Sequence, residues 1–297
     1  MALGIRVTFG ALATRSQTGM ANALSRLYGA QNTLTTGRRI ERASDDPGAA
    51  NQVIRLDAAL GDVGQYLRNA DQAKNVTQLA DSALNSAGEL IRDASSVVLQ
   101  AANSPNNTPE ARQALAARLG RIKDQLVGIA NTNLNGRYLF AGQRTETRPF
   151  DPADAAHVYQ GDNGRIRAEI NRGEYVTTNV SGDEVFAALL VDFEATGADI
   201  LAGNLRSLSE VGVAKMADGL KRVLTARGRV GAVGTQIEAT RARLDAAQQE
   251  FTELRSNLAD ADMTQAVVDL QAAQNVYQAS LASTARTFER SLMDYLR

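Results

Sequence analysis

The stretch RLDAALGDVGQYLRNADQAKNVTQLADSALNSAGELIRDASSVVLQAAN, residues 55–103, decides the fold. Its apolar residues follow one another at gaps of four and three, the 3.5-residue average of a helix that packs along its whole length, with one extra gap of three. These residues are Leu56, Leu60, Val63, Leu67, Ala70, Ala73, Val76, Ala80, Ala83, Ala87, Leu90, Ala94, Val97 and Ala101. About 50 residues rising 1.5 Å each predict a rod of roughly 75 Å, which needs a partner along its seam.

Two further segments repeat this spacing. Thr108-Pro109-Glu110 is a typical helix start, with an N-cap, a proline in the first turn and an early acid. The residues of the two seams are Leu115, Leu119, Ile122, Leu126 and Ile129, then Val230, Val233, Ile237, Thr240, Leu244, Ala247, Phe251, Leu254 and Leu258. Three similar seams predict a mainly α fold, an elongated antiparallel helical bundle or coiled coil built from both halves of the chain, with both termini at one end.

The segment 141–205 has a different character. Seven of the 14 aromatic residues lie between Tyr138 and Phe193, and apolar and polar residues alternate in three short runs. These runs are 158–160, 165–170 and 175–178, separated by Asn163-Gly164 and Asn171-Arg172-Gly173. The pattern predicts a small antiparallel β-meander, and therefore a β-rich insertion domain at the end of the bundle away from the termini.

Both ends of the chain predict amphipathic helices with narrow apolar stripes. The predicted division is 1–42 and 265–297 as terminal helices, 43–140 and 206–264 as a helical rod domain, and 141–205 as the insertion. We expect the terminal helices to pack on each other and on neighbouring molecules. The residues predicted to carry this assembly are Leu12, Leu24, Leu27, Leu34, Arg38, Arg39, Leu281, Phe288 and Leu292.

The composition argues against catalytic and metal chemistry. The chain has no Cys and one His, so thiolate sites and His-rich metal clusters are excluded, and a His-dependent triad would depend on His157 alone. His157 has no Ser and Asp at motif spacing, and a surface or packed role is favoured. The sequence therefore predicts no enzyme, no catalytic residue, no cofactor and no metal site.

The net charge of −1 combines two opposite parts. Residues 1–42 carry six Arg and one acid, whereas residues 141–205 carry five Arg and eleven acids. The N-terminal arginines are spread out, with few aromatic residues among them, which argues against binding to nucleic acid or an anionic membrane. No window reaches the 18 apolar residues of a membrane span, and the start lacks the order of a cleavable signal peptide.

Three local motifs have structural interpretations. Asp45-Asp46-Pro47-Gly48 could be a carboxylate pair, but acids before a proline favour a helix start. Gly37 suits a left-handed helix end, with Arg38 and Arg39 at the negative pole of the helix and intersubunit pairing of either arginine left open. The glycines at 228, 231 and 234 do not match a nucleotide-binding fingerprint and are expected to permit close helix approach.

Three phrases resemble the bacterial flagellin family, which includes flagellins and the hook-associated proteins related to them. The first joins Leu34-Thr35-Thr36-Gly37-Arg38-Arg39-Ile40 to Ala43-Ser44-Asp45-Asp46-Pro47-Gly48-Ala49-Ala50. The second, Asn135-Gly136-Arg137-Tyr138-Leu139-Phe140-Ala141-Gly142 with Pro149-Phe150, is similar to the hook-associated members. The third motif, Asp260-Ala261-Asp262-Met263-Thr264-Gln265-Ala266, resembles the corresponding motif of flagellins more than that of the hook-associated members.

The resemblance implies a secreted structural subunit of the bacterial flagellum, exported without a cleaved signal, that joins hook to filament. A short flagellin that forms the filament itself is the alternative. The implied partners are further copies of the chain, a neighbouring hook-associated adaptor, flagellin and an export chaperone. It also implies terminal helices that are disordered in the free monomer, because a narrow apolar face cannot offset the ordering entropy of a helix until assembly buries it.

Overall fold

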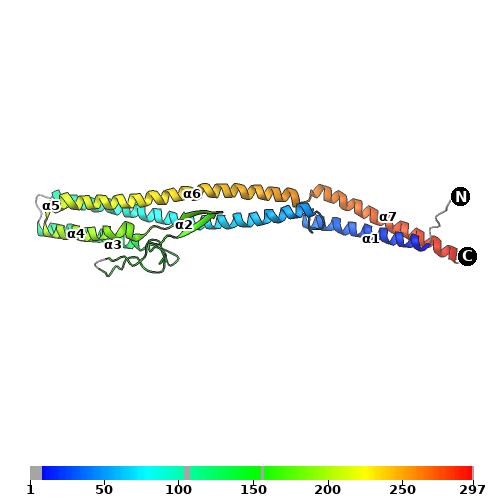
Figure 1. Ribbon diagram of the computed structural model, residues 1–297, viewed down its shortest axis with the longest axis horizontal. Coiled ribbons are helices and arrows are strands. Elements are labelled where there is room, and N and C mark those ends of the chain that lie inside the picture. Colours follow the sequence, from blue (N-terminus) through cyan, green and yellow to red (C-terminus); the bar gives the residue numbers. More distant parts are fainter. Residues whose placement is uncertain (1–8, 104–107, 155–156, 296–297) are drawn as a thin grey trace. The chain divides into compact units, whose positions relative to one another are not determined.

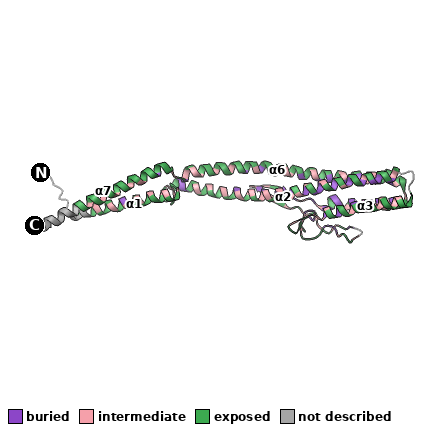
Figure 2. Ribbon diagram, turned by 180° about the vertical axis from the view of Figure 1, so that it is seen from behind, coloured by how far each residue is buried: buried purple, intermediate pink, exposed green. Residues whose placement is uncertain are grey.

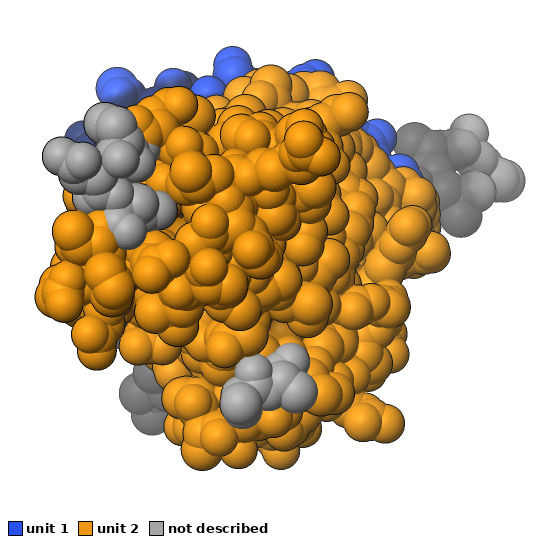
Figure 3. All heavy atoms as spheres, turned by 90° about the vertical axis from the view of Figure 1, so that its left-hand side faces the viewer, with its two compact units in different colours: residues 1–61, 249–297 blue, residues 62–248 orange. Residues whose placement is uncertain are grey.

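The structure is a computed structural model that describes residues 9–103, 108–154 and 157–295, with side chains described there except at 9, 10, 12, 13 and 287–295. It divides into two units, coloured separately in Figure 3. Unit 1 holds residues 1–61 and 249–297, and unit 2 holds residues 62–248. The division falls inside the two longest helices, α2 (Pro47–Asn103) and α6 (Val213–Ala259), so each contributes to both units.

Unit 2 is a bundle in which α3 (Pro109–Ala130) and α4 (Ala188–Ala202) pack with the long helices (Figure 1). Its core is formed by fully buried residues from all four helices, among them Leu84, Leu126, Phe193 and Val223. The predicted antiparallel helical bundle, built from both halves of the chain with small sheets beside it, is confirmed.

Helix α2 confirms its predicted seam. Every residue of that seam, from Leu56 to Ala101, is buried or half-buried (Figure 2). Leu84, Ile91 and Val98 are also fully buried although they lie outside the seam. A seam at 3.5-residue spacing covers one partner, whereas α2 shares its core in unit 2 with three other helices and so buries a wider face.

The antiparallel register of α2 and α6 is marked by ion pairs. In unit 2, Asp71 pairs with Arg241 over 3.1 Å and Asp81 with Arg227 over 2.9 Å. In unit 1, the carboxylate of Asp57 lies 2.7 Å from the guanidinium of Arg255. Leu254, which the sequence placed in the seam, is 44 % exposed, because here the half-buried Arg255 faces α2 instead.

The strands form two small antiparallel pairs. Strand β1 (Asn133–Leu134) pairs with β2 (Arg137–Tyr138), and β3 (Arg167–Asn171) pairs with β4 (Glu174–Thr177). The prediction of a β-meander with a third strand is wrong, because Tyr159 makes only an isolated bridge with Phe150. The Tyr159 hydroxyl instead donates to the backbone carbonyl of Phe140, which fixes the loop without a ladder.

The segment 141–205 also contains helix that the sequence pattern did not predict. A π-helical turn, η1 (Asp183–Ala187), leads into α4, and α5 (Leu205–Ser207) and the π-helical turn η2 (Leu208–Gly212) lead into α6. Residues of α4 that lie three and four apart are buried against the bundle: Leu189, Leu190, Phe193, Thr196 and Ile200. Val191 and Leu201 are apolar although they are exposed, so apolar residues are not confined to one side of α4 and its helical spacing is weak in the sequence.

The β3–β4 hairpin docks on α2 and α6. Ile170 and Val176 are buried against Ala70, Ala73 and Ile237. Thr240, the one polar residue of the α6 seam, is fully buried, and its hydroxyl donates to the Glu174 carboxylate over 3.2 Å. The polar exception in the seam therefore serves to hold the hairpin.

The α6 glycines do not act as expected. A Cβ added at Gly228, Gly231 or Gly234 would meet no described atom within 4 Å, so these glycines line no close helix contact. Gly228 and Gly231 are exposed, whereas Gly234, four residues after Val230 and three before Ile237, lies on the buried side of α6 and is half-buried.

Unit 1 contains α1 (Phe9–Thr36) and α7 (Met263–Tyr295), which pack on each other, together with the start of α2 and the end of α6. Asp262 precedes α7 and accepts from the backbone N–H of Thr264 over 2.8 Å, which satisfies a free donor at the helix start.

Candidate assembly surface

Two connectors pair inside unit 1. Gly37 ends α1 with a φ of 68°, the left-handed conformation predicted for it. The connector that follows forms a bridge from Arg38 to Asp260, and the N–H of Ala261 donates to the Gly37 carbonyl over 2.8 Å. Backbone bonds therefore tie the α1–α2 connector to the α6–α7 connector.

Arg38 and Arg39 differ in their surroundings. The Arg39 guanidinium donates to the Leu258 carbonyl over 2.7 Å and lies 3.9 Å from the carboxylate of Asp46, so its partners are within its own chain. The Arg38 side chain is exposed, and its guanidinium has no partner among the residues that the structure describes. Of the two predicted assembly arginines, Arg38 is the one available to a neighbour.

Asp45 and Asp46 form a turn and a helix cap. The Asp46 carboxylate accepts from the N–H of Ala49 over 3.0 Å, at the start of α2. The Asp45 carboxylate accepts from the N–H groups of Arg42 and Glu41, and these two bonds lower the pKa of Asp45. The carboxylates are thus occupied by backbone donors, which confirms the cap and turn interpretation.

The faces of α1 and α7 bury few side chains. Ala23 and Ala266 are the buried apolar residues among their described side chains. The predicted assembly residues Leu24, Leu27 and Leu34 are half-buried. Leu281 is 42 % exposed. Leu12, Phe288 and Leu292 lie outside the residues with described side chains.

Several exposed apolar residues on these helices lie outside the predicted set. They are Tyr28, at 62 % exposure, with Met263, Val267, Val268 and Val276. The narrow stripe predicted for the C-terminal helix is Val267, Leu270, Ala273, Tyr277, Leu281, Phe288, Leu292 and Tyr295. Val268 and Val276 fall beside this stripe, so the apolar face of α7 is wider than the sequence pattern predicted. A count of apolar residues on both sides of the stripe would have found them.

Groups capable of metal or acid–base chemistry form no cluster in the described ranges. No group of three or more His, Asp or Glu side chains there could hold a metal ion. His157 is buried, with a φ of 46°, and neither ring nitrogen has a hydrogen-bond partner among the described residues. None of the described helices is both long and apolar enough to cross a membrane.

The chain has relatives among hook-associated proteins. It is 28% identical over 186 residues to flagellar hook-associated protein 3 of Salmonella typhimurium, covering 62% of this chain and 58% of the relative. It is 32% identical over 163 residues to the protein of the same name from Escherichia coli, covering 54% and 50%. The match thus spans little more than half the length of these relatives.

Solved structures share the fold. A flagellar hook-associated protein from Vibrio parahaemolyticus superposes with a TM-score of 0.68 at 19% identity, covering 73% of this chain and 100% of that chain. FlgL of Bacillus cereus gives 0.61 at 20% identity, covering 68% and 99%.

Family models match both halves of the chain. The bacterial flagellin N-terminal helical region matches residues 9–145, which include α1, α2 and α3. The C-terminal helical region matches residues 213–296, which include α6 and α7. The segment between the two matches holds the β3–β4 hairpin and α4. With the two helical regions of flagellins present in sequence and paired in the fold, the chain belongs to the bacterial flagellin family.

Proposed function

We propose that the chain is a structural subunit of the bacterial flagellum that joins the hook to the filament. The observation that carries this proposal is the extent of similarity to hook-associated protein 3, which reaches 58% and 50% of the length of two such relatives. Flagellin relatives match over smaller shares of their own length, such as 38% for flagellin B of Helicobacter pylori.

The proposed role depends on self-association of the terminal helices. Residues 1–42 and 265–297 form the assembly core in this proposal, 43–140 and 206–264 the rod domain, and 141–205 the insertion. Exposed apolar side chains such as Val268, Val276 and Leu281 support it. Full burial of such a side chain is worth about 1.5–3 kcal/mol, and because these three are about half exposed, a neighbour that covers them supplies about half of that for each. The helices would be disordered in the free monomer and would order as this area is buried.

The residues proposed to form the contacts between copies are Leu12, Leu24, Leu27, Leu34, Arg38, Leu281, Phe288 and Leu292. Arg39 was predicted with them. Its proposed role is to hold the connector in place within its own chain, since its guanidinium donates to the Leu258 carbonyl and faces Asp46.

The proposed partners follow from this role. Outside the cell, the chain contacts other copies of itself, a hook-associated adaptor on the hook side and flagellin on the filament side. Before export it is held by a chaperone. The subunit acts by packing rather than by catalysis, without a cofactor and without binding nucleic acid or membrane.

The test is electron microscopy of cells that lack this chain. Hooks without filaments, with flagellin shed into the medium, are the expected result, and expression of the chain should restore the filaments. If instead the purified chain alone polymerises into long filaments, the chain is a short flagellin and the junction proposal is wrong.

A further inference from the structure

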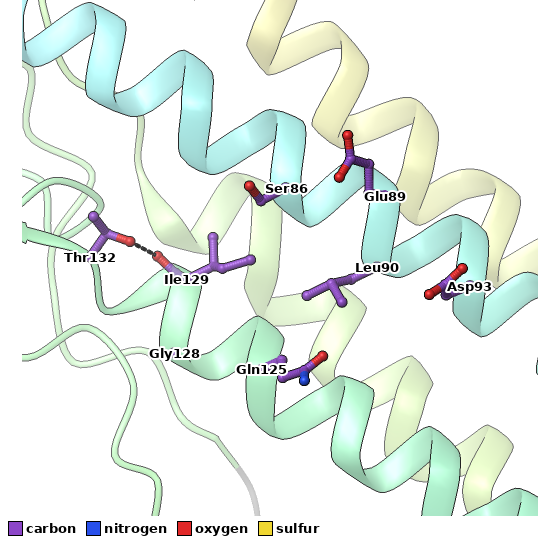
Figure 4. Close-up of a pocket in the computed structure, with 8 residues that line it drawn as sticks. All are labelled: Ser86, Glu89, Leu90, Asp93, Gln125, Gly128, Ile129 and Thr132. Atoms are coloured by element: carbon purple, nitrogen blue, oxygen red, sulfur yellow. Dashed lines mark hydrogen bonds between the residues drawn. The ribbon is translucent and has the colours of Figure 1, made fainter.

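A groove runs between α2 and α3 in unit 2 (Figure 4). Its volume is about 650 Å³, and Leu90 and Ile129 point toward each other between the two helices. Gly128 leaves one side open, since no described atom lies within 4 Å of a Cβ placed there. The groove is therefore an accessible trough with a half-buried apolar floor.

The groove is acidic. Glu89 and Asp93 lie one turn apart on α2, and the lining residues Ser86, Glu89, Leu90, Asp93, Gln125, Gly128, Ile129 and Thr132 include no cation. Glu89 accepts from the Asn85 side chain over 3.0 Å, but neither carboxylate has an ion-pair partner within 4 Å among the described residues. Arg227 is near enough to Glu89 for electrostatic attraction, but its guanidinium forms its ion pair with Asp81. We call this trough the acidic groove.

The β3–β4 hairpin presents the opposite charge. One of its faces, with Ile170 and Val176, is buried on α2 and α6. The exposed side carries three arginines and a tyrosine that is 57 % exposed, and none of these arginines has an ion-pair partner among the described residues. The residues of this arginine face are Arg165, Arg167, Arg172 and Tyr175. Glu169, opposite Tyr175, lies on the same face, is half-buried and accepts from the N–H of Gly173, so the face keeps an excess of two positive charges.

The two surfaces match in spacing as well as charge. Arg165 and Arg167, two residues apart in extended chain, are separated by about 6.7 Å. Side chains one helical turn apart, such as Glu89 and Asp93, lie about 5–6 Å from each other. Tyr175 projects from the same face as Arg167, so its ring can cover the apolar floor while the arginines reach the acidic rim.

The hairpin cannot reach the groove of its own chain. It is anchored on α2 at Ala70 and Ala73, whereas the groove begins at Ser86. Thirteen residues of helix, about 20 Å, separate Ala73 from Ser86. Arg165 lines a pocket with Thr77, which is still nine residues, or about 13 Å along the helix, from Ser86.

We propose that the arginine face of one copy docks in the acidic groove of a second copy. The contact joins two different surfaces. Each copy can therefore offer its arginine face to one neighbour and its acidic groove to another, which is the kind of contact that builds a closed ring. The proposal extends the self-association in the proposed function from the terminal helices to unit 2.

The test uses disulfide trapping in the full chain, which has no native Cys. Ser86→Cys lines the groove and Thr177→Cys lies beside Arg167 across the hairpin, so the charged residues stay intact. Mixing the two variants under mild oxidation should give a covalent dimer that high salt suppresses. Val191→Cys, which is 58 % exposed on α4, replaces Thr177→Cys in the control. Random collision would favour this more exposed site, so an equal yield overturns the proposal.

Charge reversal tests the pairing itself. Arg165→Glu with Arg167→Glu in the Thr177→Cys chain, or Glu89→Arg with Asp93→Arg in the Ser86→Cys chain, should each lower the yield about tenfold. Mixing the two reversed chains should restore it, and circular dichroism of each variant checks folding. Failure to restore, with both variants folded, contradicts the docking.

Trapping is done without hooks, so its failure leaves the junction role standing. Failure of the microscopy test with successful trapping overturns the junction role alone.

Discussion

The guanidinium of Arg39 donates a hydrogen bond to the backbone carbonyl of Leu258 across 219 positions of sequence, over 2.7 Å. The carbonyl of Ala259 next to it accepts from the N–H of Arg39 over the same distance. One residue thus fixes the α1–α2 connector to the end of α6 through both its backbone and its side chain.

Arg39→Ala should loosen the paired connectors. Loss of a charged hydrogen bond costs about 1.5–3 kcal/mol, which corresponds to a rise of tenfold or more in local amide exchange at Arg39's neighbours and at Ala261. Hydrogen exchange read by mass spectrometry measures it in the assembled protein, because residues 1–42 are proposed to be disordered in the free monomer. Arg38→Ala is the matched control, because the Arg38 guanidinium has no partner among the described residues, and equal effects of the two changes would contradict the assignment.

Hairpin docking should depend on pH through Glu174. Its carboxylate accepts from Gln236, Thr240 and Arg243, and the bond from Gln236 is the largest cause that lowers the pKa of Glu174. Because the folded pKa lies below the unfolded value of about 4.3, this stabilisation is complete above that value and is lost as the pH falls through the folded pKa.

Hydrogen exchange of the segment 167–177 measures this loss between about pH 6 and about pH 3, a range that brackets the ordinary pKa of a glutamate carboxyl group. Glu174→Gln keeps the shape but removes the charge, so its protection should be lower at the upper end of the range and should change less on acidification. An unchanged acid response in the variant would show that other carboxyl groups control the docking.

Two glycines of the α4 region should respond in opposite ways to alanine. Gly203 ends α4 with a φ of 73°, and a Cβ there would collide with the Arg112 guanidinium. Gly203→Ala should therefore lower the free energy of unfolding by at least about 1 kcal/mol. Gly197→Ala, within α4 and facing open space, should raise it by about 0.5–1 kcal/mol. Urea denaturation of both variants measures the difference, and a shift of the same sign for both would be the contrary result.

Truncation before Leu281 should separate folding from assembly. Unit 2 ends at residue 248, so its core stays complete, and circular dichroism should show a soluble, cooperatively unfolding bundle. The truncated chain should not restore filaments to cells that lack the full chain, because the exposed face of α7 is shortened. Junctions built from the truncated chain would show that the end of α7 is dispensable.

The sequence predicts the seam of α2 well because long helices with one apolar stripe carry a strong periodic signal. It missed Leu84 and Ile91 because periodicity identifies one contact face and cannot count how many helices will surround it. It missed α4 because no side-chain hydrogen bond caps η1 or α4, so the usual start signal of a helix is absent from the sequence there.

The assembly surface could be predicted only in outline. The stripes of α1 and α7 located the apolar residues, but the different surroundings of Arg38 and Arg39 depend on the Leu258 carbonyl, which is far away in sequence. The acidic groove likewise has no sequence signature, since its lining is divided between α2 and the segment from α3 to Thr132.

The ion pair between Asp81 and Arg227 joins residues 146 positions apart, which has a consequence for the timing of folding. A ribosome adding 5–20 residues per second needs about 7–30 s to proceed from one to the other. During that interval the buried face of α2 has no α6 to cover it, and such long-range closure is slow in any chain. The order of synthesis thus keeps the new chain open for many seconds, a period in which a binding protein can capture it before the bundle closes.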